Sequence, residues 1–190
     1  MLIEKKMYSI KNGLLLNSNV IYAPSVNFND RPIDAVISLL VIHCASLPEG
    51  EYDNNNLELL FSGEINNNNK LLDLGLSLNT EVSTHLYIKR SGEIIQFVPF
   101  DKRAWHAGVS DFQGRTACND FSIGIELQGT VTTDFTTEQY HSLVNTTKII
   151  LECYPEINLN NIVGHSTIAP SRKKDPGERF NWQFYLTSVC

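Results

Sequence analysis

The feature that most constrains the fold is an apolar run, AVISLLVI, over residues 35–42. A run rich in β-branched and aliphatic residues predicts a strand that is covered on both faces, because neither face carries a stripe of polar side chains. Such a strand lies inside a sheet with a packed layer on each side. The run therefore predicts a sheet-centred fold and places the next residue, His43, at a strand end, where sheet proteins open onto ligand crevices.

Three further segments have strand patterns. Residues 82–89 and 93–98 are joined at Ser91-Gly92, which predicts a β-hairpin. Residues 121–128 alternate cleanly, which predicts one apolar and one polar face. The predicted apolar face carries Phe121, Ile123, Ile125 and Leu127, and the other carries Ser122, Gly124, Glu126 and Gln128.

One long helix is predicted after Thr136. Gln139 follows three residues later, so the pair forms a capping box, and Pro155 predicts the end of the helix. Strands with interspersed helices predict an α/β or α+β fold with helices packed on a central sheet. Since 190 residues fit one domain and no repeat or linker divides the chain, we expect a single domain over residues 1–190.

Composition excludes several classes of function. A net charge of −6 argues against nucleic acid as a partner, and no apolar run approaches the length of a membrane span. Lys5, Lys6 and Lys11 precede only a three-leucine run, residues 14–16, which is too short for a secretory signal. We therefore expect a cytoplasmic protein without membrane attachment, in which the four widely spaced cysteines are reduced.

Two asparagine runs, residues 54–56 and 66–69, are the low-complexity parts of the chain. They flank a short apolar stretch that contains Leu57, Leu60 and Phe61. The pattern predicts mobile surface segments around a short helix.

The segment GHSTIAPSRKKDPG, residues 164–177, concentrates chemistry in a short stretch. Pro170 and Pro176 remove backbone donors and fix φ, which predicts a shaped loop and argues against a helix. The loop carries His165 and Asp175, and an imidazole and a carboxylate are both good ligands for zinc. Metal-assisted hydrolysis is therefore the first hypothesis, and it needs a third ligand and a base.

His43 is the best candidate for the third ligand, because two histidines and one carboxylate form a recurring catalytic zinc set. Without those partners it would be an ordinary histidine at a strand end. The pattern predicts a hydrogen-bonded structural role for His85 and a solvated position for His141, on the polar face of the long helix. His106 follows Trp105 in a loop, where substrate contact and a structural role are equally open.

Glu126 is the candidate base. Ser122 and Gly124 share its predicted face, so small neighbours would leave space in front of the carboxylate, which could take a proton from water. Most glutamates on strands are surface residues, which is the alternative. Lys173 could direct its ammonium group at the oxyanion of a tetrahedral intermediate, or it could be a solvated loop lysine.

Four blocks of sequence resemble the zinc-dependent N-acetylmuramoyl-L-alanine amidases, and they occur in the family's order over roughly residues 20–182. The blocks are VIHCASLP around His43, VPFDKRAWHAGVS (98–110), CNDFSIGIELQG (118–129) and GHSTIAPSRKKDPG (164–177). The resemblance implies a mixed central sheet with helices packed against it and a zinc site in a surface groove. It places the Zn²⁺ ligands at His43, His165 and Asp175, the catalytic glutamate at Glu126 and a lysine that stabilises the transition state at Lys173.

The resemblance also implies contacts with substrate, and here the chain departs from its close relatives. Cys44 stands where they usually carry a substrate-contacting asparagine, and Thr116-Ala117 replaces a second basic residue, leaving Arg115. We expect Cys44, Arg115, Trp105 and His106 to contact the substrate.

The activity implied is hydrolysis of the amide between anhydro-N-acetylmuramic acid and L-alanine in soluble muropeptides, as in peptidoglycan recycling. The expected partner is this small-molecule substrate; the oligomeric state stays open, with a monomer favoured. Three alternatives stay open: a lytic amidase acting on the intact cell wall, a non-catalytic peptidoglycan recognition module, and a general zinc peptidase.

Overall fold

The computed structural model describes residues 8–65 and 68–190. Met1 and Met7, Lys5 and Lys6, and Asn66 and Asn67 lie outside the described residues, so the structure does not bear on the leader or on that part of the second asparagine run. Within the described residues no helix is both long enough and apolar enough to cross a membrane.

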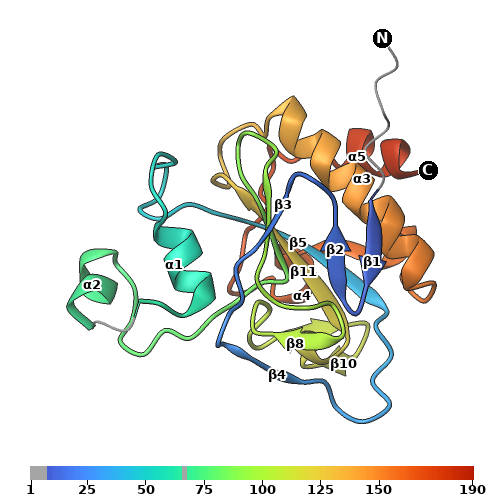
Figure 1. The fold of residues 1–190 in the computed structure, drawn as a ribbon, viewed down its shortest axis with the longest axis horizontal. Helices are drawn as coiled ribbons and strands as arrows, with labels where there is room; N and C mark the ends of the chain where they lie inside the picture. Colours follow the sequence, from blue (N-terminus) through green and yellow to red (C-terminus); the bar gives the residue numbers. More distant parts are fainter. Residues whose placement is uncertain (1–7, 66–67) are drawn as a thin grey trace.

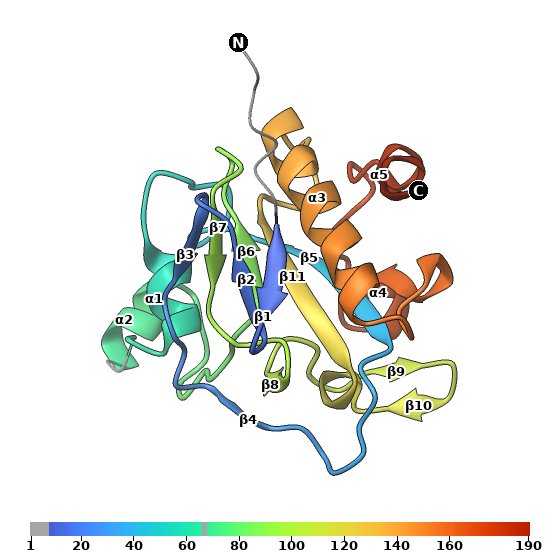
Figure 2. The ribbon, with the colours of Figure 1, turned by 45° about the vertical axis from the view of Figure 1, so that its right-hand side comes forward.

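A six-stranded sheet forms the centre of the molecule, with the order β12-β5-β11-β6-β7-β3 (Figures 1 and 2). The β6–β7 pair is antiparallel and the other pairs are parallel, which confirms the predicted mixed sheet. The strands, in sheet order, are β12 (Ile162–Gly164), β5 (Leu39–Ala45), β11 (Ser122–Gln128), β6 (Leu86–Ile88), β7 (Ile94–Gln96) and β3 (Val20–Tyr22).

Strand β5, which lies between β12 and β11, is covered on both faces, as its apolar sequence predicts, and residues 39–42 are fully buried. It begins four residues later than predicted and continues through His43 to Ala45. Pairing with β11 sets this start, because the first registered pair is Ser122 with Leu39. Val36, which lies before the paired region, is 53% exposed.

Helices cover the two faces of the sheet unequally (Figure 2). On one face α3 (Thr137–Cys153) and α5 (Trp182–Val189) pack on the apolar side of β5, β11 and β6, together with the hairpin of β1 (Ser9–Lys11) and β2 (Leu14–Leu16). On the opposite face α1 (Asn56–Ser62) and α2 (Asn68–Asp73) pack on Tyr87, Ile95 and Phe97. The second face carries the polar side chains of β11 and therefore the site.

Local sequence signals explain several boundaries. Thr136 caps α3 through its side chain, Gln139 completes the capping box, and the helix ends just before Pro155 as predicted. The predicted hairpin at Ser91-Gly92 forms, although its strands are shorter than expected. Gly92 has a φ of 82°, which only glycine adopts without strain.

The remaining elements are short. Two small ribbons pair β4 (Phe28–Asp30) with β8 (Lys102–Ala104) and β9 (Asp111–Phe112) with β10 (Arg115–Thr116). Single-turn helices are η1 (Cys118–Asp120), η2 (Leu159–Asn161) and α4 (His165–Ile168).

Two sequence predictions are wrong in detail. Phe121 precedes β11 and packs with Leu39 and Val41, on the face opposite to Ile123. The segment 164–177 contains one helical turn, α4, because both prolines lie beyond it.

Candidate metal centre and its pocket

Three side chains from separate elements converge on one point. His43 extends from β5, His165 is the first residue of α4, and Asp175 lies in the loop that follows α4. The two Nδ1 atoms are 3.0 Å apart, and each is 3.1 Å from Asp175 Oδ2. The backbone N–H of Ser166 donates to the carbonyl of Asp175 at 3.0 Å, which holds the carboxylate beside His165.

The far nitrogen of each imidazole is already engaged. His165 Nε2 lies 3.1 Å from the carbonyl oxygen of Ala107, which only accepts, so Nε2 carries the proton and Nδ1 offers a lone pair. His43 Nε2 lies 2.9 Å from His106 Nδ1, and His106 Nε2 lies 3.1 Å from Ser122 Oγ. When His106 donates through Nε2 to Ser122, its Nδ1 atom accepts a hydrogen bond from Nε2–H of His43. In that arrangement Nδ1 of His43 has no proton and offers its lone pair.

The ionisation of this set favours a cation. Burial lowers the pKa of His43 to about 4, so its imidazole is neutral at pH 7. Burial alone would raise the pKa of Asp175, but the close contacts of its carboxylate with His165 and His43 outweigh burial and hold the pKa well below its usual range. The neutral imidazole of His43, the Nδ1 atom of His165 and the carboxylate of Asp175 therefore direct three ligand atoms and one negative charge at a common point.

The donor set fits zinc. Tetrahedral zinc binds nitrogen and oxygen at about 2.0–2.1 Å, which places neighbouring ligand atoms about 3.3 Å apart. The observed separations of 3.0–3.1 Å are close to that value. Three protein ligands would leave a fourth position for water or substrate, as in catalytic zinc sites.

Glu126 lies next to this set on β11. In the parallel register it pairs with His43 on β5 and with Tyr87 on β6, so the three side chains lie in a row on one face of the sheet. Its Oε2 atom is buried and has no hydrogen-bond partner among the residues that the structure describes. Burial raises the pKa of Glu126 well above its usual value, the charge of Asp175 raises it further, and Lys173 lowers it. A desolvated carboxyl of this kind is suited to proton transfer.

A pocket of about 310 Å³ opens over these groups. Its lining includes Glu126, His165, Lys173 and Asp175. Most of its apolar lining comes from the segment between β5 and β6, including Leu47, Leu57, Leu60, Phe61, Leu76 and Val82. Sequence analysis treats this segment as surface structure around a short helix. The helix is confirmed as α1, but its apolar side chains line the pocket. The asparagine runs on either side of the helix make the segment look like surface structure, so the sequence does not reveal this role.

The four predicted substrate contacts have different positions. Cys44, Trp105 and His106 line the pocket, whereas Arg115 is exposed, stacks on Phe121 at 3.7 Å and is not among the lining residues. Burial raises the pKa of the Cys44 thiol, so it stays protonated and donates to the carbonyl of Pro176. Contact with substrate stays a prediction for all four.

The other histidines are where the sequence places them. His85 is buried, accepts from the N–H of Gly124 and contacts the carbonyl of Lys102, while His141 is exposed on α3. The space predicted in front of Glu126 is partly filled, because His106 lies on Gly124 and contacts Ser122. The sequence does not reveal the contact with the Ala107 carbonyl, since any residue could supply that oxygen.

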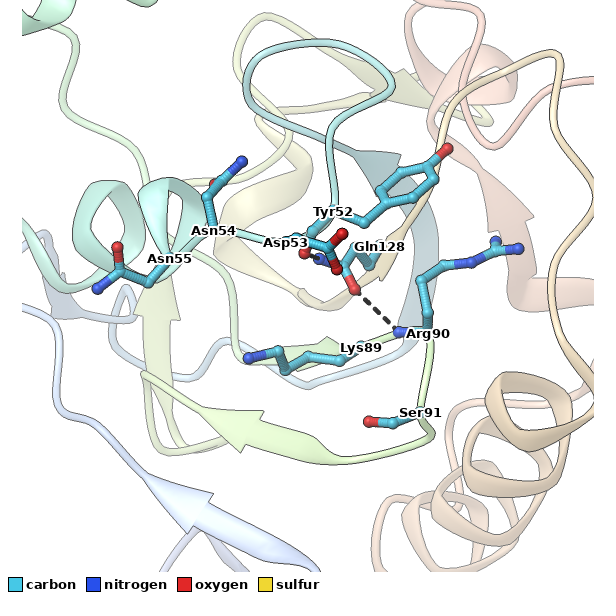
Figure 3. A pocket seen from close by; sticks show the side chains of 8 residues that line it. All are labelled: Tyr52, Asp53, Asn54, Asn55, Lys89, Arg90, Ser91 and Gln128. Atoms are coloured by element: carbon cyan, nitrogen blue, oxygen red, sulfur yellow. Dashed lines mark hydrogen bonds between the residues drawn. The ribbon is translucent and has the colours of Figure 1, made fainter.

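A larger hollow of about 640 Å³ lies elsewhere on the surface and is lined by Tyr52–Asn55, Lys89–Ser91 and Gln128 (Figure 3). The two cationic side chains of this hollow, Lys89 and Arg90, already have partners within the protein. Lys89 contacts Glu58 at 2.8 Å, and Arg90 donates to the carbonyl of Asp134 at 2.8 Å. Volume therefore does not identify the site, and the chemistry lies in the smaller pocket.

Two imidazoles and a carboxylate that could hold a metal, beside a desolvated glutamate, define the class of metal-dependent hydrolases. Residues 31–178 match the family described as N-acetylmuramoyl-L-alanine amidase, and the chain belongs to this family.

Curated relatives and solved structures agree with this assignment. The 1,6-anhydro-N-acetylmuramyl-L-alanine amidase AmpD of Escherichia coli K12 is 49% identical over 87% of this chain and 90% of its own length. A crystal structure of a selenomethionine AmpD derivative has a TM-score of 0.86 and 45% identity, and the match covers 95% of this chain and 99% of that one. The amidase AmiD from E. coli, solved with the substrate anhydro-N-acetylmuramic acid-L-Ala-D-γ-Glu-L-Lys, has a TM-score of 0.64 and 28% identity, covering 97% of this chain and 66% of that one.

Proposed function

We propose that this chain is a zinc-dependent amidase that cleaves the bond between 1,6-anhydro-N-acetylmuramic acid and the L-alanine of soluble muropeptides. The observation that carries the proposal is the convergence of His43, His165 and Asp175 beside Glu126 and Lys173, around one pocket. The identity to AmpD over most of both chains supports the choice of substrate. We place the reaction in cytoplasmic peptidoglycan recycling and treat residues 1–190 as one amidase domain acting as a monomer.

His43, His165 and Asp175 would hold the zinc ion. When bound, zinc supplies Lewis acidity that polarises the amide carbonyl and acidifies water. Glu126 takes the proton of the attacking water as the new C–O bond forms, and it returns that proton to the nitrogen of L-alanine as the C–N bond breaks. The products are the free lactyl carboxylic acid of the sugar and a stem peptide with a free amine.

Lys173 contributes through its charge. Lys173 lines the pocket, and its charge lowers the pKa of Glu126, which supports a role near the reacting groups. A cation placed there stabilises the oxyanion that develops on the carbonyl oxygen. The apolar side chains of α1 that line the pocket would limit the access of water, and a lower local dielectric strengthens these electrostatic interactions.

Product analysis by mass spectrometry tests the proposal. Purified protein is incubated with anhydro-N-acetylmuramyl peptides, with the same peptides on reducing-end N-acetylmuramic acid, and with intact peptidoglycan. We expect release of stem peptide from the anhydro form, loss of activity after chelation, and recovery with zinc. Equal kcat/KM on the two sugar forms would contradict the anhydro preference. Cleavage of ordinary peptides would favour a general peptidase, and efficient action on intact peptidoglycan a lytic amidase.

A further inference from the structure

Two consecutive residues, His106 and Ala107, hold both histidine ligands of the candidate metal centre. His106 Nδ1 lies 2.9 Å from Nε2 of His43, and the carbonyl oxygen of Ala107 lies 3.1 Å from Nε2 of His165. We call His106-Ala107 the orienting dipeptide. It determines which nitrogen of each imidazole faces the metal, because a neutral imidazole that donates through Nε2 offers its lone pair at Nδ1.

The orienting dipeptide is itself held by a single buried amide. Asn119, which is 7% exposed and lies in η1, accepts with its Oδ1 atom from the backbone N–H of His106 at 3.1 Å and of Ala107 at 2.8 Å. Those two contacts fix the peptide groups on either side of His106, Trp105–His106 and His106–Ala107. Asn119 therefore anchors the backbone of the two residues whose acceptors face His43 and His165, although it touches neither of these imidazoles.

The side chain of Arg172 also contacts the orienting dipeptide, at the carbonyl of Ala107. Arg172 donates through Nη2 to the carbonyl oxygens of Ala107 at 2.7 Å and Val109 at 2.9 Å. The Ala107 carbonyl oxygen thus accepts two hydrogen bonds, one from Arg172 and one from His165. Arg172 is exposed, so its removal is compatible with an intact fold.

We propose that Asn119 is a positioning residue for the metal centre, acting through the orienting dipeptide, with Arg172 as the second hold on the Ala107 carbonyl. The inference rests on the proposed metal-binding function and adds residues that orient the ligands. Removing groups of this kind typically weakens metal affinity about 10–100-fold.

The test measures zinc affinity by chelator competition, independently of activity. Asn119→Leu keeps the approximate volume and removes the acceptor, Asn119→Asp keeps the acceptor, and Arg172→Leu tests the second hold. The control is Asn27→Leu, since Asn27 is an equally buried asparagine, 8% exposed, whose amide instead donates to the carbonyl of Val82. We expect about 10–100-fold weaker zinc binding in Asn119→Leu and Arg172→Leu, and affinity near that of the wild type in Asn119→Asp and Asn27→Leu.

Nitrogen-15 NMR of the imidazoles provides a second readout. In the wild type we expect His43 and His165 to carry their protons on Nε2, and in Arg172→Leu we expect the His165 population to become mixed. Zinc affinity of the wild-type level in both Asn119→Leu and Arg172→Leu would overturn the inference. If Asn119→Leu does not fold, Arg172→Leu and the wild-type spectrum decide. A wild type without measurable zinc binding would instead contradict the proposed function.

Discussion

The imidazole ring of His106 lies directly on the backbone of Gly124 in β11. A Cβ atom built at Gly124 would lie 2.5 Å from both Cγ and Nδ1 of the ring. A real Cβ atom essentially never makes a non-bonded contact that short, so this strand position must be glycine for the ring to lie there. The requirement is steric and does not arise from backbone conformation, because Gly124 is not among the glycines with positive φ.

Gly124→Ala is expected to displace the His106 ring and weaken its hydrogen bond with His43. We expect zinc affinity to fall about 10–100-fold, as measured by chelator competition. A double-mutant cycle with His106→Ala gives the control, because the added methyl group has no ring to meet in that background. Additive losses in the cycle would show that the methyl group acts elsewhere.

Glu126→Gln is expected to keep bound zinc and lose turnover. The amide has nearly the same volume as the carboxyl group but cannot accept a proton from water, and general-base catalysis typically contributes about 10²–10⁴-fold. Single-turnover kinetics and metal analysis measure the two effects separately. Glu152→Gln, an exposed change on α3, is the matched control. Loss of zinc in Glu126→Gln would indicate a structural role.

Lys173→Met is expected to lower kcat on the order of a hundredfold, with a smaller change in KM, because oxyanion stabilisation acts mainly in the transition state. The neighbouring Lys174 is exposed and provides a matched control, Lys174→Met. Steady-state kinetics on the same muropeptide measures both. Equal effects of the two substitutions would make Lys173 an ordinary loop lysine.

Stability of the metal-free protein is expected to depend on pH through His85. Burial, followed by the charge of Arg31, holds the pKa of His85 well below its usual value, so the folded protein keeps it neutral. The unfolded chain protonates it below about pH 6.5. The unfolded state thus binds the extra proton, and the free energy of unfolding falls as the pH falls below that value, by up to about 1.4 kcal/mol per pH unit.

Urea denaturation between pH 5 and 8 checks this dependence. His85→Gln retains an acceptor for Gly124 and a donor for Lys102 without the titrating ring, so we expect a shallower slope between pH 6 and 5. His141→Gln, at an exposed position on α3, should leave the slope unchanged. An identical slope in the wild type and His85→Gln would assign the dependence to the other buried histidines.

Sequence reasoning predicts the parts of this protein that depend on local pattern. The buried character of residues 39–42, the capping box at Thr136 and the hairpin at Gly92 follow from side-chain chemistry over a few residues. The pairing of Glu126 with Tyr87 follows from strand register, which one sequence does not encode locally.

The same distinction applies to the site. His43, His165 and Asp175 are recognisable because their chemistry restricts the residue type. The Ala107 carbonyl is a backbone group and carries no signature, and Asn119 reads as an ordinary loop asparagine until its two backbone contacts are seen. The start of β5 and the helical turn α4 depend on tertiary pairing and exact spacing, so their boundaries were also missed.

The pocket is assembled from separate parts of the chain, including Trp105 and His106 from the segment after β8. Its reactive groups come from β5, β11 and the segment after β12, whereas most of its apolar lining comes from the connection between β5 and β6. That connection leaves the sheet at Ala45 and re-enters it at Leu86. We therefore expect this connection to determine substrate preference. Replacing it with the corresponding segment of a relative would change which muropeptides are cleaved, while the reaction stays the same.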